Sequence, residues 1–134
     1  MAIRRPFCWN DADVLGRWVV WLGLVAVWTV GLLTPNPDRA VRDVLPPQAL
    51  FPAAKALHVS AYAFLAALAA WLPLRGPLRG LPVAFLALHG AATEFLQQFV
   101  PTRTASVRDV LLDLAGIGLG LILSWPWWRP RRDR

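Results

Sequence analysis

The chain has 134 residues, which suits a single domain, and 57% of them are apolar, a share typical of a membrane protein rather than a soluble one. The net charge is +6, but the arginines gather at the chain ends and in short connectors, so the sequence argues against a nucleic-acid-binding surface. Cys8 is the only cysteine, which excludes an intrachain disulfide bond and a thiolate metal site.

Four apolar segments follow one another along the chain, at about residues 15–33, 56–74, 81–100 and 107–125. Each is close to the roughly 20 residues that a helix needs to cross a bilayer. Strand-like alternation is absent, and a helix satisfies its own backbone hydrogen bonds in lipid. The sequence therefore predicts an all-α integral membrane bundle of four transmembrane helices, a single domain over residues 1–134. In the longest connector, residues 38–45 form either a short amphipathic helix on the membrane surface or a solvated loop.

The basic residues divide unequally between the two sides of this bundle. The larger and less neutralised group lies on the side of the chain ends and comprises Arg4, Arg5, Arg17, Arg75, Arg79, Arg129, Arg131, Arg132 and Arg134. The opposite side has Arg39, Arg42, Lys55, Arg103 and Arg108. By the positive-inside rule, both termini are expected in the cytoplasm, and the protein is expected to be a multi-pass protein of the cytoplasmic membrane. Its first segment is interpreted as an uncleaved anchor.

Polar side chains are concentrated at the outer end of the predicted bundle. An ionisable group at the centre of a membrane helix costs roughly 2.5–3.5 kcal/mol, so such groups are rare unless they have a function. Helical spacing places Lys55, His58 and Tyr62 on one face of the second helix. Gly116 and Gly120, on the fourth helix, are expected to let a neighbouring helix approach closely. The last two helices and their connecting turn bring further polar groups to the same boundary: Glu94, Gln97, Gln98, Arg103, Ser106, Asp109 and Asp113.

Simple structural roles compete with functional ones at this boundary. Ser106 has the place of an N-cap for the fourth helix, with Asp109 completing a capping box three residues later. Arg103 has carboxylates nearby in sequence with which it can form an ion pair. Lys55 can extend toward the lipid headgroups, and Tyr62 can act as an interfacial aromatic residue.

A metal site is disfavoured by the spacing of the candidate ligands. His58, Glu94, Asp109 and Asp113 offer nitrogen and oxygen atoms, but the sequence has no paired-histidine spacing of the kind that binds zinc. We therefore expect neither a metal nor another cofactor. His89 stands alone near the middle of the third helix and is expected to be a hydrogen-bonded packing residue.

Four short patterns in this order resemble the VanZ-like family. Residues 55–62 match K-x-x-H-x-x-x-Y, and residues 94–103 match E-x-x-Q-x-F-x-P-x-R. Residues 103–109 match R-x-x-S-x-x-D, and residues 113–120 follow N-x-x-G-x-x-x-G apart from the first position. The resemblance covers roughly residues 32–123. Two departures stand out: Ala54 where the family usually has aspartate, and Asp113 where it usually has asparagine.

The resemblance implies a role in the cell envelope, because the namesake of the family is associated with resistance to the glycopeptide teicoplanin. The first hypothesis is that the polar boundary binds a membrane lipid or a lipid-linked envelope precursor, with an effect on glycopeptide susceptibility as one consequence. Arg103 would bind the anionic group, since its planar guanidinium suits phosphate. Gln97 and Gln98 would orient the headgroup.

Two alternatives remain open from the sequence. In the first, the protein is a membrane-embedded hydrolase or transferase acting on a lipid phosphate or ester, with His58, Glu94 and Asp109 as the catalytic candidates. In the second, it is a structural scaffold in which Glu94, Arg103 and Asp109 pair with one another as an internal latch. The sequence leaves the ligand, any reaction and the oligomeric state open.

Overall fold

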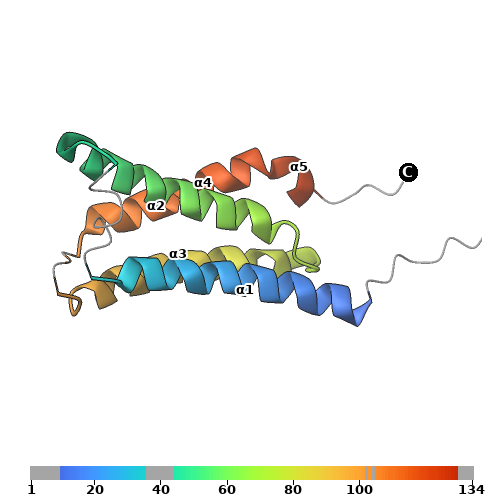
Figure 1. Cartoon of the computed structure of the whole chain (residues 1–134). Coiled ribbons are helices and arrows are strands. Elements are labelled where there is room, and N and C mark those ends of the chain that lie inside the picture. The colour runs from blue at the N-terminus through green and yellow to red at the C-terminus, as the bar shows by residue number, and fades with distance from the viewer. Residues whose placement is uncertain (1–9, 36–43, 102, 104, 130–134) are drawn as a thin grey trace, which may run out of the picture.

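The regular structure of the chain is helical throughout the part that a computed structural model describes, residues 10–35, 44–101, 103 and 105–129 (Figure 1). The helices are α1 (Asp11–Leu33), α2 (Pro47–Ala69), the short 3₁₀ helix η2 (Gly76–Arg79), α3 (Gly80–Gln97), α4 (Val107–Leu123) and the single-turn α5 (Trp125–Trp128). This confirms the predicted all-α class. Most of residues 38–45, where an amphipathic helix or a loop was expected, lie outside the described residues.

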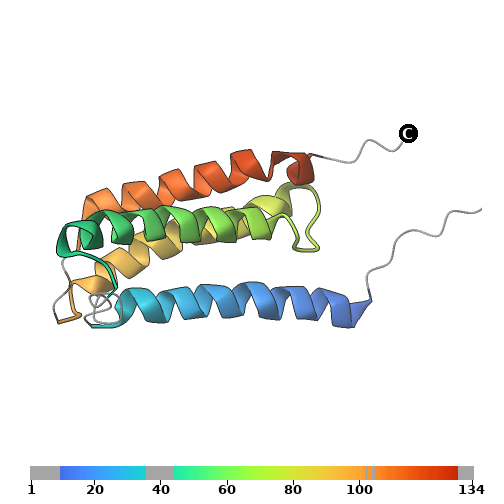
Figure 2. The same cartoon turned by 45° about the horizontal axis from the view of Figure 1, so that its top comes forward.

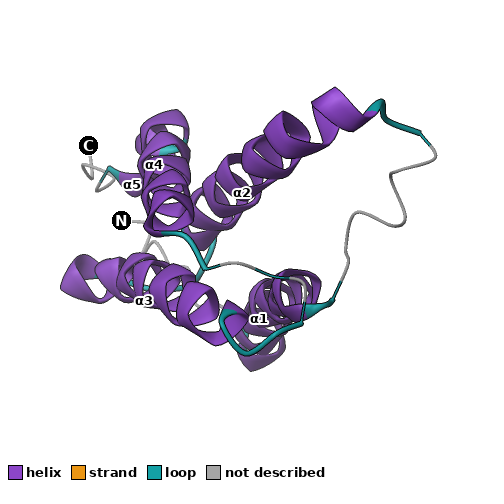
Figure 3. Cartoon of the chain, turned by 90° about the vertical axis from the view of Figure 1, so that its left-hand side faces the viewer, coloured by secondary structure: helices purple, strands orange, loops and turns teal. Residues whose placement is uncertain are grey.

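The four long helices alternate in direction along the chain (Figures 1 and 2). The C-terminal ends of α1 and α3 therefore lie beside the N-terminal ends of α2 and α4. We call this the polar end of the bundle, because Lys55, Glu94, Arg103 and Asp109 lie there. Viewed from the polar end, α2 runs beside α4, and α1 and α3 lie across from that pair (Figure 3).

Glycines in α4 explain why α2 and α4 pack so closely. A Cβ atom added at Gly116 would lie 2.5 Å from the carbonyl oxygen of Val59, and one at Gly120 would overlap the carbonyl of Ala63. A side chain of any size at these positions would push the helices apart. The prediction that both glycines permit close helix approach is confirmed.

The helix boundaries differ most from the predicted ones at α2. This helix begins at Pro47 and ends at Ala69, rather than spanning about residues 56–74. Proline is well suited to the first turn of a helix, so Pro46 and Pro47 introduce α2 instead of merely closing the preceding connector. Pro52 lies inside the helix, near its start. The apolar run used for the prediction begins only after these turns.

The other predicted segments shift by a few residues. Helix α1 begins at Asp11, where the Asn10 side chain accepts a 2.8 Å hydrogen bond from the backbone N–H of Asp13. Helix α3 ends at Gln97, and the next three residues continue as hydrogen-bonded turns. Helix α4 ends at Leu123, before the single turn of α5.

Two of the helices, α1 and α2, are long and apolar enough to cross a membrane. Helix α3 has 18 residues and α4 has 17, and neither is both as long and as apolar as such a helix needs to be. Polar residues are nevertheless buried between the helices, among them His58, Thr93, Glu94, Gln97, Asp109 and Asp113. Large apolar residues face outward on all four long helices, among them Val27, Val30, Leu57, Phe64, Leu88, Phe95, Leu111 and Ile122.

Arginines and tryptophans hold the opposite end of the bundle together. Arg17 donates a hydrogen bond to the Trp71 carbonyl and lies over the Trp71 ring. Arg79 donates to the carbonyls of Trp127 and Trp128 and packs over the Trp128 ring. Tryptophan and arginine together suit a membrane–water interface. We call this the tryptophan end.

Candidate functional site

The polar end brings together side chains from α2, α3, α4 and the connection between α3 and α4, and α1 contributes backbone carbonyls. The sequence-predicted residues divide into an outer layer of contacts near the helix ends and an inner layer one or two turns deeper. The outer layer contains Lys55, Glu94, Gln97, Gln98, Arg103, Ser106 and Asp109, and the inner layer contains His58, Tyr62 and Asp113.

Lys55 and Asp109 form an ion pair that joins α2 to α4. The Lys55 Nζ atom lies 2.5 and 2.6 Å from the two carboxylate oxygens of Asp109. Asp109 is buried, while Lys55 is partly exposed. The expected capping box is therefore wrong, because the Asp109 carboxylate is engaged by Lys55 and not by the start of its own helix. The same pair replaces the expected free extension of Lys55 toward the headgroups.

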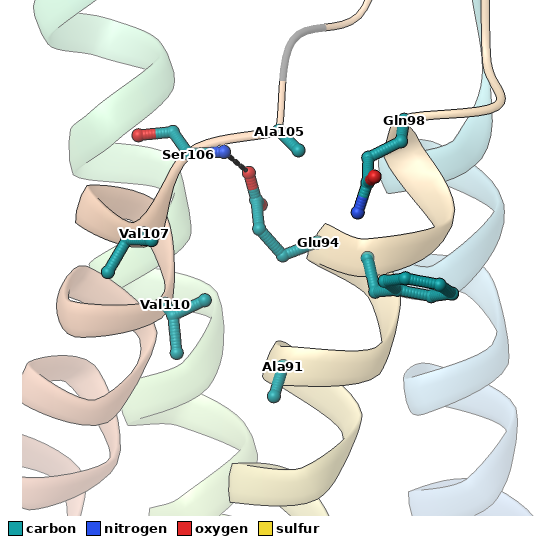
Figure 4. Close-up of a pocket in the computed structure, with 8 residues that line it drawn as sticks. Ala91, Glu94, Gln98, Ala105, Ser106, Val107 and Val110 are labelled. Carbon is teal, nitrogen blue, oxygen red and sulfur yellow. Dashed lines mark hydrogen bonds between the residues drawn. The ribbon is translucent and has the colours of Figure 1, made fainter.

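Glu94 performs the capping role that the sequence assigned to the Asp109 side chain, because it accepts the backbone N–H of the N-cap residue. Ser106 is the N-cap residue of α4, but its hydroxyl makes no capping hydrogen bond. Its backbone N–H instead donates to Oε1 of the Glu94 carboxylate, which reaches across from α3 (Figure 4). The N-terminal end of a helix favours a negative charge, so this contact stabilises both the carboxylate and the helix start.

Arg103 and Gln97 bind the C-terminal end of α1. The Arg103 guanidinium donates hydrogen bonds to the carbonyl oxygens of Gly31, at 3.1 Å, and Thr34, at 3.3 Å. The Gln97 amide donates to the Leu32 carbonyl at 3.0 Å. These carbonyls have no partner within the helix, so both side chains cap α1 and hold it against α3. Binding of an anion by Arg103 stays a prediction.

The His58 ring is oriented by Asp113 in the inner layer. Its Nδ1 atom lies 2.9 Å from Oδ1 of Asp113, which is 2% exposed. Within the described chain, the ring nitrogens have no hydrogen-bond partner other than this carboxylate. The Nε2 atom of His58 retains some exposed surface and so is not fully buried, while a buried carboxylate fixes the other side of the ring, an arrangement that suits a general base.

A partly buried chain of hydrogen bonds joins α1, α2 and α3. Thr29 donates to the Val25 carbonyl, so its hydroxyl oxygen accepts from Nε2–H of His89 at 2.8 Å. The Nδ1 atom of His89 then accepts from the Tyr62 hydroxyl at 2.9 Å. The prediction of a hydrogen-bonded packing role for His89 is confirmed. Tyr62 is fully buried and is not an interfacial residue.

Sequence reasoning missed Thr29 as a member of this polar interior. A threonine in an apolar helix donates to its own backbone so often that it gives no distinctive signal. Trp28 was also missed: its ring packs edge-on against the rings of His58 and Tyr62.

An open pocket of about 230 Å³ lies between α3 and α4 at the polar end (Figure 4). Glu94 and Gln98 point toward it from α3 and its C-cap, while the Ser106 hydroxyl turns away. Apolar side chains form the remaining walls, so the pocket combines an apolar lining with a carboxylate and an amide. Its described lining residues are Ala91, Glu94, Phe95, Gln98, Ala105, Ser106, Val107 and Val110.

The candidate metal ligands are distributed over separate contacts. Asp109 is paired with Lys55, Glu94 caps α4, and Asp113 binds His58. Over the described ranges of the chain, no group of three or more histidine, cysteine, aspartate or glutamate side chains is placed to hold a metal ion.

Two helices long and apolar enough to cross a membrane, together with polar side chains buried between the helices, suit a small helical membrane protein. The chain belongs to the VanZ/LLP1 family, since the sequence model of that family matches residues 14–129. The resemblance noted from the short patterns is thereby confirmed. No curated protein and no solved structure matches the chain.

Proposed function

We propose that this protein spans the cytoplasmic membrane four times and binds an envelope lipid, or the lipid part of an envelope precursor, at its polar end. Exposed apolar side chains on α3 and α4 support the two additional spans, because lipid can cover residues such as Leu88, Phe95, Leu111 and Ile122. Polar side chains in these helices turn inward, which reduces the number of charges that face lipid.

The proposed orientation places the polar end at the extracytoplasmic boundary. The described arginines at the tryptophan end are Arg17, Arg75, Arg79 and Arg129, and both the start of α1 and the end of α5 lie at this end. At the polar end the described basic residues are Lys55, Arg103 and Arg108, and Lys55 is neutralised by Asp109. This difference in basic charge supports cytoplasmic termini.

The observation that carries the proposal is the amphiphilic pocket between α3 and α4. Its apolar walls include Phe95 and Val107, which also face outward and so join the pocket to the lipid-facing surface of the bundle. Its polar groups, Glu94 and Gln98, lie at the level of the helix ends. A ligand that has a polar head and an apolar chain matches both features. Arg103, at the same end of the bundle, would meet the phosphate of such a lipid.

Filling the pocket tests this proposal. Ala91 lines the pocket and is exposed, so Ala91→Phe places a ring in the binding space without disturbing the core. Ala92 is also exposed but does not line the pocket, which makes Ala92→Phe the matched control. Purified protein is extracted and its retained lipids are quantified by mass spectrometry. We expect Ala91→Phe to lose bound lipid and Ala92→Phe to retain it; equal retention in both would refute the proposal.

The His58–Asp113 pair favours a second candidate function, a membrane-embedded hydrolase or transferase. With Nδ1 held by Asp113, the Nε2 atom of His58 would take a proton from water or from an acceptor hydroxyl attacking a lipid phosphate or ester. The test incubates the reconstituted protein with defined phospholipids and follows products by mass spectrometry. This candidate requires turnover that His58→Gln abolishes. Turnover that persists in His58→Gln, or none in the unaltered protein, would eliminate it.

A further inference from the structure

We infer that the α3–α4 pocket selects a small lipid headgroup that donates hydrogen bonds, either a hydroxyl or an ammonium group. This inference rests on the proposed lipid-binding function and names the chemistry of its ligand. It starts from Glu94, which is 5% exposed and whose side chain lines the pocket. A buried carboxylate in an apolar-walled space requires partners for both of its oxygen atoms.

Only one oxygen atom of Glu94 has a partner within the described chain. Oε1 accepts the backbone N–H of Ser106, and no hydrogen bond involves Oε2. The Oε2 atom is not fully buried, so it retains contact with the pocket space. A molecule in the pocket therefore meets an acceptor with an unused lone pair, beside the Gln98 amide.

The charge of the lining favours a donor over an anion. Among the described residues that line the pocket, Glu94 is the one ionisable side chain, and none is cationic. A phosphate placed here would face the Glu94 carboxylate at short range without a compensating positive charge. A hydroxyl or ammonium group would instead form a charge-assisted hydrogen bond, which is about twice as strong as a neutral one.

The size of the pocket limits what part of the ligand enters it. Its volume of about 230 Å³ is smaller than the roughly 300–1,000 Å³ that encloses a drug-sized molecule. A glycerol or ethanolamine group is small enough to be held within this volume, whereas most of a sugar–peptide headgroup would have to lie outside it. The phosphate would then lie outside the pocket at the polar end, where Arg103 lies, and the acyl chains would lie along the exposed faces of Phe95, Val107 and Leu111.

A lipid panel with identical dioleoyl chains tests the inference. The purified protein in detergent is titrated with phosphatidylethanolamine, phosphatidylglycerol, phosphatidylcholine and phosphatidic acid, and binding is measured by native mass spectrometry. Phosphatidylethanolamine offers an ammonium donor and phosphatidylglycerol offers hydroxyl donors, whereas the choline group has no N–H. We expect at least one of the two donor lipids to bind about tenfold more tightly than phosphatidylcholine, and the better one identifies the source of the donor.

Two variants connect the preference to Glu94. Glu94→Gln retains an oxygen that can accept from Ser106 but replaces Oε2 with an amide donor, so the preference for donor lipids should fall about tenfold. If Glu94→Gln does not fold, Gln98→Leu provides a second test. It leaves the α4 cap intact and should weaken the same preference for donor lipids. If phosphatidylcholine binds as well as both donor lipids, and Ala91→Phe blocks all of them, the headgroup inference is wrong and lipid binding stands. If Ala91→Phe blocks none, the proposed function itself is wrong.

Discussion

The close packing of α2 against α4 makes a sharp prediction about two glycines that lie two residues apart. An added Cβ at Gly116 would lie 2.5 Å from the backbone carbonyl oxygen of Val59, whereas one at Gly118 would meet no atom within 4 Å. Alanine at either position gains about 1 kcal/mol of helix propensity over glycine. At Gly116 this gain is opposed by overpacking, which costs about 1–3 kcal/mol. The backbone carbonyl cannot rotate away, so we expect a cost near the upper end of that range.

The difference between Gly116→Ala and Gly118→Ala isolates the overpacking cost, because helix propensity contributes equally to both variants. We expect Gly118→Ala to be as stable as the unaltered protein or up to about 1 kcal/mol more stable. Gly116→Ala should be about 1–2 kcal/mol less stable. Unfolding by denaturing detergent, followed through tryptophan fluorescence, measures the two free energies. Equal stability of the two variants would refute the close α2–α4 contact.

Three further predictions follow from the polar contacts and the orientation. Lys55→Ala leaves the buried Asp109 carboxylate without its partner and should lower the free energy of unfolding by about 1–3 kcal/mol, while Lys55→Ala combined with Asp109→Ala should recover part of that loss in a double-mutant cycle. Tyr62→Phe removes the donor to Nδ1 of His89 and should cost about 1–2 kcal/mol in the same unfolding assay; an unchanged stability would contradict the hydrogen-bond chain. Reporter fusions at the two chain ends should both be active on the cytoplasmic side, and opposite signals from the two ends would exclude an even number of spans.

Much of the bundle could be predicted from hydropathy and proline positions. The four apolar segments correspond to the four long helices, and the small-residue spacing in α4 predicted its close approach to α2. The start of α2 could not be predicted in this way, because residues 47–55 mix proline, polar and apolar side chains without a continuous apolar run. Proline at the first position of a helix is a separate signal that outweighs the missing apolar pattern.

The sequence predicted which residues gather at the polar end but not how they pair. Periodicity within one helix places Lys55 and His58 on the same face, yet it cannot show that α4 supplies Asp109 and Asp113 at matching heights. Local rules therefore favoured the nearest partner in sequence, a capping box within α4. The structure instead uses partners that lie 54 and 55 residues apart in the chain, which only the packing of α2 on α4 can bring together.

The observed pairings also change the latch alternative. As expected from the sequence, a latch would join Glu94, Arg103 and Asp109 to one another. The described contacts instead connect Asp109 to Lys55, Arg103 to α1 and Glu94 to the start of α4. These contacts stabilise the bundle, but the second oxygen atom of Glu94 remains available to a ligand. A purely structural role would not require that atom to face a pocket.

Photo-crosslinking with a lipid that has a diazirine in its headgroup tests the central claim most directly. The protein is reconstituted with the labelled lipid and irradiated, and modified peptides are identified by tandem mass spectrometry. Binding at the polar end predicts labelling concentrated on the pocket residues of α3 and α4, between Ala91 and Val110, and lost in Ala91→Phe but not in Ala92→Phe. Labelling that is spread equally over both ends of the bundle, or that is unchanged in Ala91→Phe, would contradict lipid binding in this pocket.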